Sequence, residues 1–94
     1  LLFAMLTEDL GYMIEAIGPS FPDAHLRRRK TNGRWEPIRA EFEYRASSFR
    51  THKHNSKECD LIICWENDWA QAPLEVIALK DVIAHLKTPK PPSS

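Results

Sequence analysis

The sequence predicts one small domain of the α/β (α+β) class, in which a small mixed sheet is built around a central hairpin and flanked by helices. Three patterns indicate this class: a helical repeat at the start of the chain, an Asn-Gly turn between two extended runs, and a later apolar run of strand length. The 94 residues, 43% of them apolar, match the size and composition of one globular domain. We assign residues 1–88 to this domain and residues 89–94 to a tail.

The first predicted elements are a helix and a strand separated by a glycine. Apolar residues from Leu2 to Leu10 recur on one side of a helix. Gly11 favours the left-handed conformation that ends many helices. Residues 12–17 are then expected to form a strand.

A hairpin is predicted at the centre of this arrangement. Residues 22–30 and 38–44 both have extended patterns, and Asn32 and Gly33 lie between them. Asn-Gly favours a two-residue type I′ turn, because both central residues of that turn need positive φ. The second run alternates between apolar and charged residues, which predicts one buried and one polar face.

The register of the hairpin decides where Asp23 lies. With a two-residue turn the numbers of paired residues add to 65, so Asp23 falls opposite Phe42, between Glu41 and Glu43. Pro37 cannot donate to the ladder, and we therefore expect a β-bulge near it. One bulged residue would bring Asp23 onto the face of the two glutamates.

The second half of the chain is predicted to alternate between helix and strand. Ser47 or Ser48 is suited to cap a short helix that runs to residue 54. Residues 60–66 form an apolar run bracketed by acids, which is typical of a central strand buried on both faces. A last strand over residues 74–79 and a short helix over residues 80–86 complete the domain.

Charge is distributed unevenly, although the formal net charge is zero. Ten Lys or Arg and four Asp or Glu lie between Asp23 and Lys57, which gives that stretch +6 and the remainder −6. A local basic surface attracts a polyanion even on a neutral protein. Trp35 lies within this stretch, and basic side chains combined with an aromatic one are typical of a nucleic-acid surface. The alternative is a hairpin whose charges are only solvated by water.

The cysteines and the hydropathy pattern bear on the compartment. Cys59 and Cys64 do not form a CxxC motif, so the pattern does not indicate a secreted disulfide scaffold. The sequence shows no apolar run long enough to cross a membrane and no signal-peptide pattern, and we expect a cytoplasmic protein. A zinc site that combines the cysteines with His52 and His54 is disfavoured, because a spacing of five places two strand residues on opposite faces.

Pro22-Asp23 followed by Glu41-Phe42-Glu43 resembles the motif of the PD-(D/E)XK nuclease superfamily, the restriction-endonuclease-like fold. Most members have Lys at the last position, where this chain has Glu43, so the resemblance is to a Glu-x-Glu variant. It covers approximately residues 2–79. The order of helix, strand, motif hairpin, short helix and buried strand contributes to it.

The resemblance implies a metal-dependent nuclease, an Mg²⁺-dependent endodeoxyribonuclease that hydrolyses DNA phosphodiester bonds. The implied catalytic and metal-binding residues are Asp23, Glu41 and Glu43, with Mg²⁺ (or Mn²⁺) held by the first two and the carbonyl of Phe42. Glu43 would act as a base or bind a second ion. The positive charge that Lys supplies in the family would come from another residue, and the candidates are Arg45, His52 and Lys53. The predicted DNA-binding residues are Arg27, Arg28, Arg29, Lys30, Arg34, His52, Lys53 and His54.

Other interpretations remain open at the level of sequence. The same fold without catalysis would be a nucleic-acid-binding module, and a third class is a structural domain that binds a protein partner. The glutamates would then form an ordinary ion-paired face with Arg39, Arg45 or the arginines of the opposite strand, an arrangement that contributes little stability. DNA is the expected partner, a membrane is not, and a homodimer is a further arrangement to test.

Overall fold

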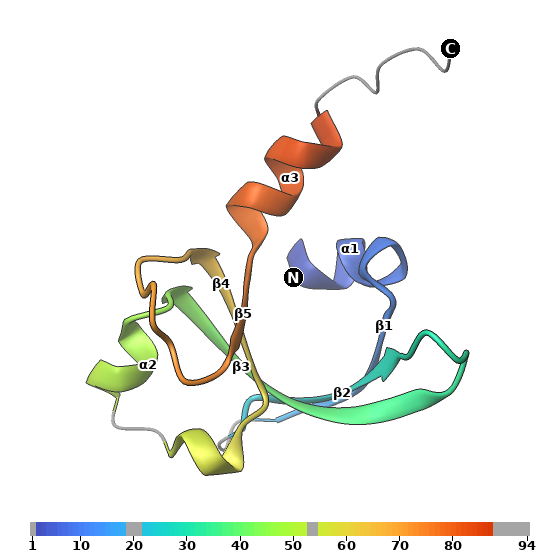
Figure 1. Cartoon of the computed structure of the whole chain (residues 1–94), viewed down its shortest axis with the longest axis horizontal. Coiled ribbons are helices and arrows are strands. Elements are labelled where there is room, and N and C mark those ends of the chain that lie inside the picture. The colour runs from blue at the N-terminus through green and yellow to red at the C-terminus, as the bar shows by residue number, and fades with distance from the viewer. Residues whose placement is uncertain (1, 19–21, 53–54, 88–94) are drawn as a thin grey trace.

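A five-stranded sheet with helices on both faces forms this α+β domain in the computed structural model, which describes residues 2–18, 22–52 and 55–87 (Figure 1). The strands lie side by side in sequence order. The elements are α1 (Leu2–Leu10), β1 (Tyr12–Ile17), β2 (Ala24–Arg29), β3 (Trp35–Arg45), α2 (Ser48–Thr51), the 3₁₀ turn η1 (Ser56–Glu58), β4 (Leu61–Glu66), β5 (Glu75–Ala78) and α3 (Leu79–Lys87). The predicted fold class and order of elements are confirmed.

The sheet is mixed because its two halves are connected differently. β1, β2 and β3 form an antiparallel meander, whereas β4 pairs parallel to β3 and β5 pairs parallel to β4. Parallel neighbours need a crossover connection. The segment that contains α2 and η1 supplies the crossover between β3 and β4. β3 is the central and longest strand, with 11 residues, and it joins the two halves.

The turn between β2 and β3 differs from the predicted type I′ turn. Lys30 and Arg34 close a three-residue loop through hydrogen bonds from Lys30 N–H to the Arg34 carbonyl (2.7 Å) and from Gly33 N–H to the Lys30 carbonyl (2.9 Å). Gly33 has a φ of 84°, the left-handed conformation required of the last loop residue when a three-residue hairpin loop contains a G1 bulge. The Asn32 side chain instead accepts a hydrogen bond from Arg34 N–H at 2.9 Å.

The extra turn residue changes the register of the hairpin by one. Arg29 pairs with Trp35, and the pairing continues without interruption to Ala24 and Ala40. The expected bulge near Pro37 is therefore wrong, since Pro37 pairs regularly with Arg27. The described bulge is in β1, between Ile14 and Ala16. Paired numbers add to 64 rather than 65, and the same register extended by one residue places Asp23 opposite Glu41.

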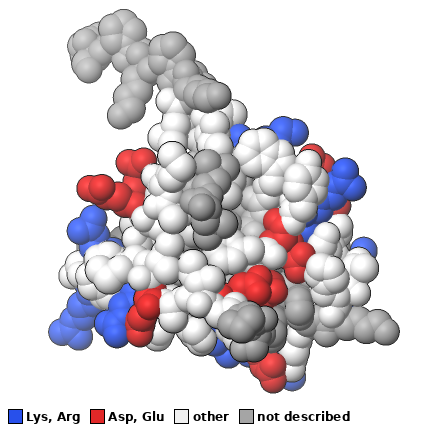
Figure 2. All heavy atoms as spheres, turned by 180° about the vertical axis from the view of Figure 1, so that it is seen from behind, with Lys and Arg blue, Asp and Glu red and all other residues white. Residues whose placement is uncertain are grey.

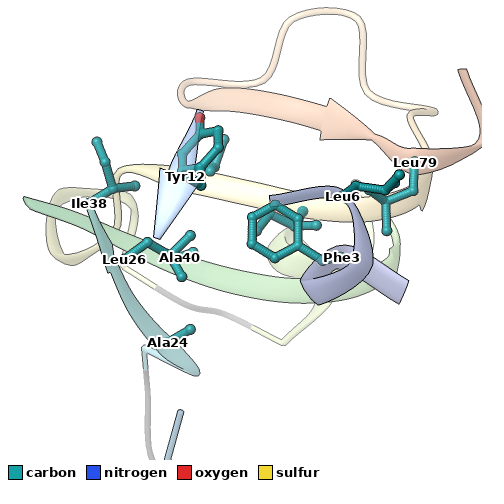
Figure 3. Close-up of a cluster of buried hydrophobic side chains, with 10 residues drawn as sticks. Phe3, Leu6, Tyr12, Ala24, Leu26, Ile38, Ala40 and Leu79 are labelled. Atoms are coloured by element: carbon teal, nitrogen blue, oxygen red, sulfur yellow. The ribbon is translucent and has the colours of Figure 1, made fainter. Parts of the chain in front are cut away.

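The larger hydrophobic cluster lies between the sheet and the helices α1 and α3. Phe3 of α1 is fully buried and contacts the ring of Tyr12 edge-on, with 5.7 Å between ring centroids. Leu26, Ile38 and other even-numbered residues of the hairpin face the same cluster, because alternate strand residues point the same way. Figure 3 shows these side chains directed toward one another. The buried members are Phe3, Leu6, Tyr12, Ala24, Leu26, Ile38, Ala40, Leu61, Ile63 and Leu79.

A smaller cluster lies on the other face, beneath α2. Phe49 anchors this short helix and is 1% exposed. It packs in a cluster with Ala46, Cys59, Ile62, Cys64 and Ala78. β4 contributes to both clusters, which confirms the prediction of a central strand buried on both faces.

The helix predicted to reach residue 54 ends earlier. α2 ends at Thr51, and His52 forms its C-cap. The Ser47 side chain does not cap the helix. Its hydroxyl and its backbone N–H donate to the Asp68 carboxylate, at 2.7 and 2.9 Å. Residues 53–54 and the predicted tail at 89–94 lie outside the described residues.

None of the helices within the described ranges has both the length and the apolar character needed to cross a membrane.

Candidate active site

Asp23 and Glu41 are joined by a hydrogen bond at the open end of the hairpin, and the Asp23 side chain accepts a second bond from the backbone next to Glu41. Asp23 N–H donates to Glu41 Oε2 at 3.0 Å, and Phe42 N–H donates to Asp23 Oδ2 at 3.0 Å. The two side chains thus satisfy backbone donors where the β2–β3 ladder ends. The register set by the turn places Asp23 beside Glu41. The bulge that was expected to bring Asp23 onto the face of the glutamates is therefore not needed.

Glu41 is buried to an extent that is unusual for a carboxyl group. The residue is 5% exposed, and it is the one buried charged residue within the described part of the chain. Burial is the main cause that raises the pKa of Glu41, to about 7. The neighbouring Asp23 carboxyl and the charge of Glu43 raise the pKa further, whereas the hydrogen bond from Asp23 N–H lowers it. The Glu41 carboxyl therefore keeps its proton at a pH where an exposed carboxyl has lost it.

Glu43 lies two residues further along the same face of β3 and contacts α2. Its Oε1 is 3.0 Å from Nδ1 of His52. The Glu43 side chain is 5% exposed and the His52 side chain 56% exposed, so the imidazole lies between the glutamate and solvent. α2 holds His52 in this place, since His52 N–H donates to the Ser48 carbonyl at 2.9 Å.

The three candidates for the missing Lys charge are in different surroundings. His52 contacts Glu43 directly. Arg45 lies 4.0 Å from Glu66, and its guanidinium lies over the ring of Tyr44. Lys53 is outside the described residues, as is His54. His52 is therefore the candidate that the described structure brings to the carboxylates.

Arg39 and Arg45 lie near acids at the two ends of β4. The ion-pair interpretation had predicted that they pair with the glutamates of β3. Arg39 donates to both oxygens of Asp60, at 3.0 and 3.1 Å, and its backbone N–H also bonds to that carboxylate. These bonds lower the pKa of Asp60. Arg45 lies near Glu66 at the other end of the strand.

The three predicted metal-binding residues belong to two separate pairs. Asp23 bonds to Glu41, while Glu43 bonds to His52. Across residues 2–18, 22–52 and 55–87, no three His, Cys, Asp or Glu side chains are grouped closely enough to form a ready-made metal centre. Two adjacent carboxylates are nevertheless a donor set that suits Mg²⁺, an ion that binds through one or two carboxylates and keeps several waters.

The basic side chains of the hairpin have different roles. Arg28 lies on the core face and bonds to Glu36 (2.9 Å), to Glu75 at the start of β5 (2.6 Å) and to the Tyr12 hydroxyl (3.3 Å). These hydrogen bonds raise the pKa of Arg28. Arg27 pairs with Glu15 at 2.6 Å in solvent. Arg28 is thus an internal crosslink within the sheet.

The remaining basic residues are on the surface. Arg29, Lys30 and Arg34 are exposed, and the Arg29 guanidinium lies over the Trp35 ring at 5.8 Å from its centroid. Seen from behind, Lys and Arg side chains gather at the end of the molecule where the hairpin turns, on the left of Figure 2.

His25, which is not among the residues predicted from the sequence, lies on the same face as the candidate site. β2 alternates, with Ala24 and Leu26 buried and His25, Arg27 and Arg29 exposed. These odd-numbered residues share the face of Asp23, so an exposed basic row leads from the carboxylates to the turn. The two-residue periodicity of β2 places His25 on this face. The run of four cations at residues 27–30 is the more prominent pattern, and it predicts DNA binding near the turn.

The two cysteines are free and buried in the smaller cluster. Burial is the main cause that raises the pKa of both thiols, that of Cys64 to about 11. The thiol of Cys59 donates to backbone carbonyls, at 3.3 Å for that of Leu61. Thiols of this kind behave as small apolar side chains rather than as metal-binding thiolates.

Comparison with known protein families, with curated proteins and with solved structures finds no match to this chain.

Proposed function

We propose that this protein is a metal-dependent nuclease that hydrolyses DNA phosphodiester bonds. The observation that carries the proposal is the buried Glu41 carboxyl, bonded to Asp23, at the end of an exposed basic row. A carboxyl group that keeps its proton beside another carboxyl group gains from an arriving cation, since the cation removes the repulsion between them and replaces the proton. The resemblance to the PD-(D/E)XK superfamily and the central position of the motif hairpin support the same proposal.

Asp23 and Glu41 are the residues that would hold Mg²⁺ (or Mn²⁺). When bound, such an ion supplies an acidic water and neutralises charge on a phosphate oxygen. The Phe42 carbonyl remains a predicted third ligand.

Glu43 and His52 would carry the proton chemistry. Glu43 would accept the proton of the attacking water, and the 3.0 Å contact with His52 holds its carboxylate in place. His52 extends into solvent beside the pair, where it would donate a hydrogen bond to the scissile phosphate. This assignment replaces the family's Lys by a residue on α2.

The basic row would bind the DNA backbone. His25 and Arg29 lie on the face that leads away from Asp23, and Lys30 and Arg34 extend it at the turn. Contacts of this kind fix the position of a nucleic acid without reading its sequence.

A nucleic-acid-binding module without catalysis is the second candidate. Glu43 in place of the family's Lys favours it, because a carboxylate cannot stabilise negative charge on a phosphate. The two candidates share the basic row and differ in the reaction.

Cleavage of supercoiled plasmid in the presence of Mg²⁺ or Mn²⁺ tests the proposal. Nicking by the parent that is lost in Asp23→Asn and Glu41→Gln supports the nuclease. Glu58→Gln, an equal change of charge on η1, is the matched control and should cleave like the parent. A parent that binds DNA but does not nick it with either ion would favour the binding module.

The proposed compartment is the cytoplasm, supported by two free buried thiols. A homodimer stays a prediction, which the mass in solution would test.

A further inference from the structure

A groove of about 380 Å³ lies beside the outer edge of β1, where α1 ends and the hairpin turns. It is lined by Tyr12, Met13, Arg29 and Trp35, together with residues at the end of α1. The volume is in the range of pockets that bind small organic molecules. The groove is separate from the Asp23–Glu41 pair.

Trp35 and Arg29 are neighbouring lining residues of this groove. They pair across the β2–β3 ladder, and the guanidinium carbon lies 5.8 Å from the centroid of the indole ring. Trp35 is 39% exposed and Met13 50% exposed, so apolar surface in the groove faces solvent. An indole combined with a guanidinium stacks well on a flat, electron-rich ring.

The charges around the groove indicate what such a ring would be attached to. Lys30 and Arg34 are exposed at the turn, within a few residues of the stacked pair, and would contact phosphates on either side of a bound ring. Glu8 also lines the groove and supplies an acceptor for an exocyclic amino group. A flat heterocycle with an amino group and flanking phosphates is a nucleobase within a strand.

We propose that this groove receives one unpaired nucleobase of the nucleic acid whose backbone lies along the basic row. The inference rests on the proposed function and names its substrate class: a strand with an extruded or single-stranded base. A paired base could not reach the indole, because its faces are covered by its neighbours in the stack.

The position of the groove predicts the distance between the unpaired base and the cleaved bond. Asp23 and Arg29 lie on one face of the hairpin, and six residues of strand span about 20 Å. Along a duplex this distance corresponds to about six base pairs. Cleavage should therefore occur about six nucleotides from the unpaired base.

The test uses a short duplex with a single bulged 2-aminopurine, compared with the matched duplex that has no bulge. Binding is measured in EDTA, so that no cleavage intervenes, by anisotropy and by quenching of the 2-aminopurine. The parent should prefer the bulged duplex by about tenfold, since stacking of one base contributes that much. Trp35→Phe keeps a ring and should keep the preference, whereas Trp35→Leu keeps an apolar side chain without a ring and should lose it. The same measurement with a bulged RNA duplex shows whether the groove prefers a base from DNA or from RNA.

Each outcome bears on the groove and on the nuclease separately. Equal affinity for both duplexes, or a preference that survives in Trp35→Leu, overturns the groove and leaves the nuclease to the plasmid assay. A Trp35-dependent preference without metal-dependent cleavage supports the groove and overturns the nuclease. Failure to bind either duplex at low salt overturns both.

Discussion

The buried carboxyl of Glu41 should make the stability of the domain depend on pH in an unusual direction. The folded state keeps a proton on this group up to about pH 7, whereas the unfolded chain releases it near the ordinary value of 4.5. Between these values the folded state binds more protons, so the free energy of unfolding falls as the pH rises. The contribution is fully present below pH 4.5 and is lost as the pH passes 7.

The magnitude follows from the difference between the two pKa values. At about 1.36 kcal/mol per pH unit, a pKa raised from 4.5 to about 7 corresponds to about 3 kcal/mol. Because Glu41 interacts with the neighbouring Asp23 and Glu43, we expect about 2 to 3 kcal/mol. In a domain of this size 1 kcal/mol changes Tm by about 4–8 °C. Tm should thus fall on the order of 10 °C between pH 4.5 and pH 7.

Glu41→Gln is the perturbation that isolates this effect. The amide keeps the shape and still accepts the hydrogen bond from Asp23 N–H, but it cannot titrate. Thermal unfolding followed by circular dichroism should show a much smaller decrease in this variant, while Glu58→Gln should follow the parent. Mg²⁺ should raise the Tm of the parent near pH 7 more than at pH 4.5, because the ion competes with the proton. Superimposable pH profiles of the parent and Glu41→Gln would refute the reasoning.

Four further predictions concern the site and the hairpin. Glu43→Gln should abolish cleavage and leave DNA affinity unchanged or higher, because a negative charge near a phosphate is removed; cleavage that survives this change would show that another residue is the base. Glu43→Lys restores the common family motif, so activity gained from an inert parent would identify a binding module, as a plasmid assay can show. Replacing Lys30 and Arg34 by Ala should weaken DNA binding evenly across sequences and reduce the slope against salt by about one for each lost phosphate contact, measured by titration at several ionic strengths; an unchanged slope would leave these side chains without a phosphate contact. Gly33→Ala should cost about 1 kcal/mol in urea unfolding, because a residue with a Cβ is strained at a φ of 84°; unchanged stability would mean that the turn relaxes to another conformation.

Regular hydrophobic patterns, and glycines that end helices or form turns, allowed most of the fold to be predicted. Gly11 has the positive φ expected of a residue that ends a helix, and the apolar run now seen as β4 is buried on both faces. Both features depend on local chemistry and on burial, which a sequence displays directly. The fold class could therefore be assigned without knowledge of any contact.

The turn shows where prediction from sequence stops. Asn-Gly is compatible with a two-residue turn, and Gly33 alone is compatible with a three-residue turn, so local propensity does not choose between them. The choice is made by burial, because the observed register places Leu26 opposite Ile38 within the larger cluster. A long-range effect of this kind changes the partner of Asp23 although the turn is eight residues away in the chain.

The site was predictable in its residue types and less so in its pairings. The motif predicts Asp23, Glu41 and Glu43 as candidates, whereas the bond between Glu43 and His52 depends on where α2 ends. The exposed basic row was predictable in principle from the alternation of β2. The run of cations around Arg28 predicts DNA binding, and the sequence cannot show that Arg28 also bonds to Glu75.

The contacts of Arg28 have a consequence for how the domain opens. β5 is a four-residue strand at the edge of the sheet, and strands of this kind usually separate first. Here the guanidinium of Arg28, 47 residues before Glu75 in the chain, connects Glu75 of β5 to Glu36 of β3 and Tyr12 of β1. If β5 separated from the sheet, Arg28 would lose its ion pair with Glu75. Backbone amides of β5 should therefore exchange with solvent together with those of the hairpin, as one cooperative unit.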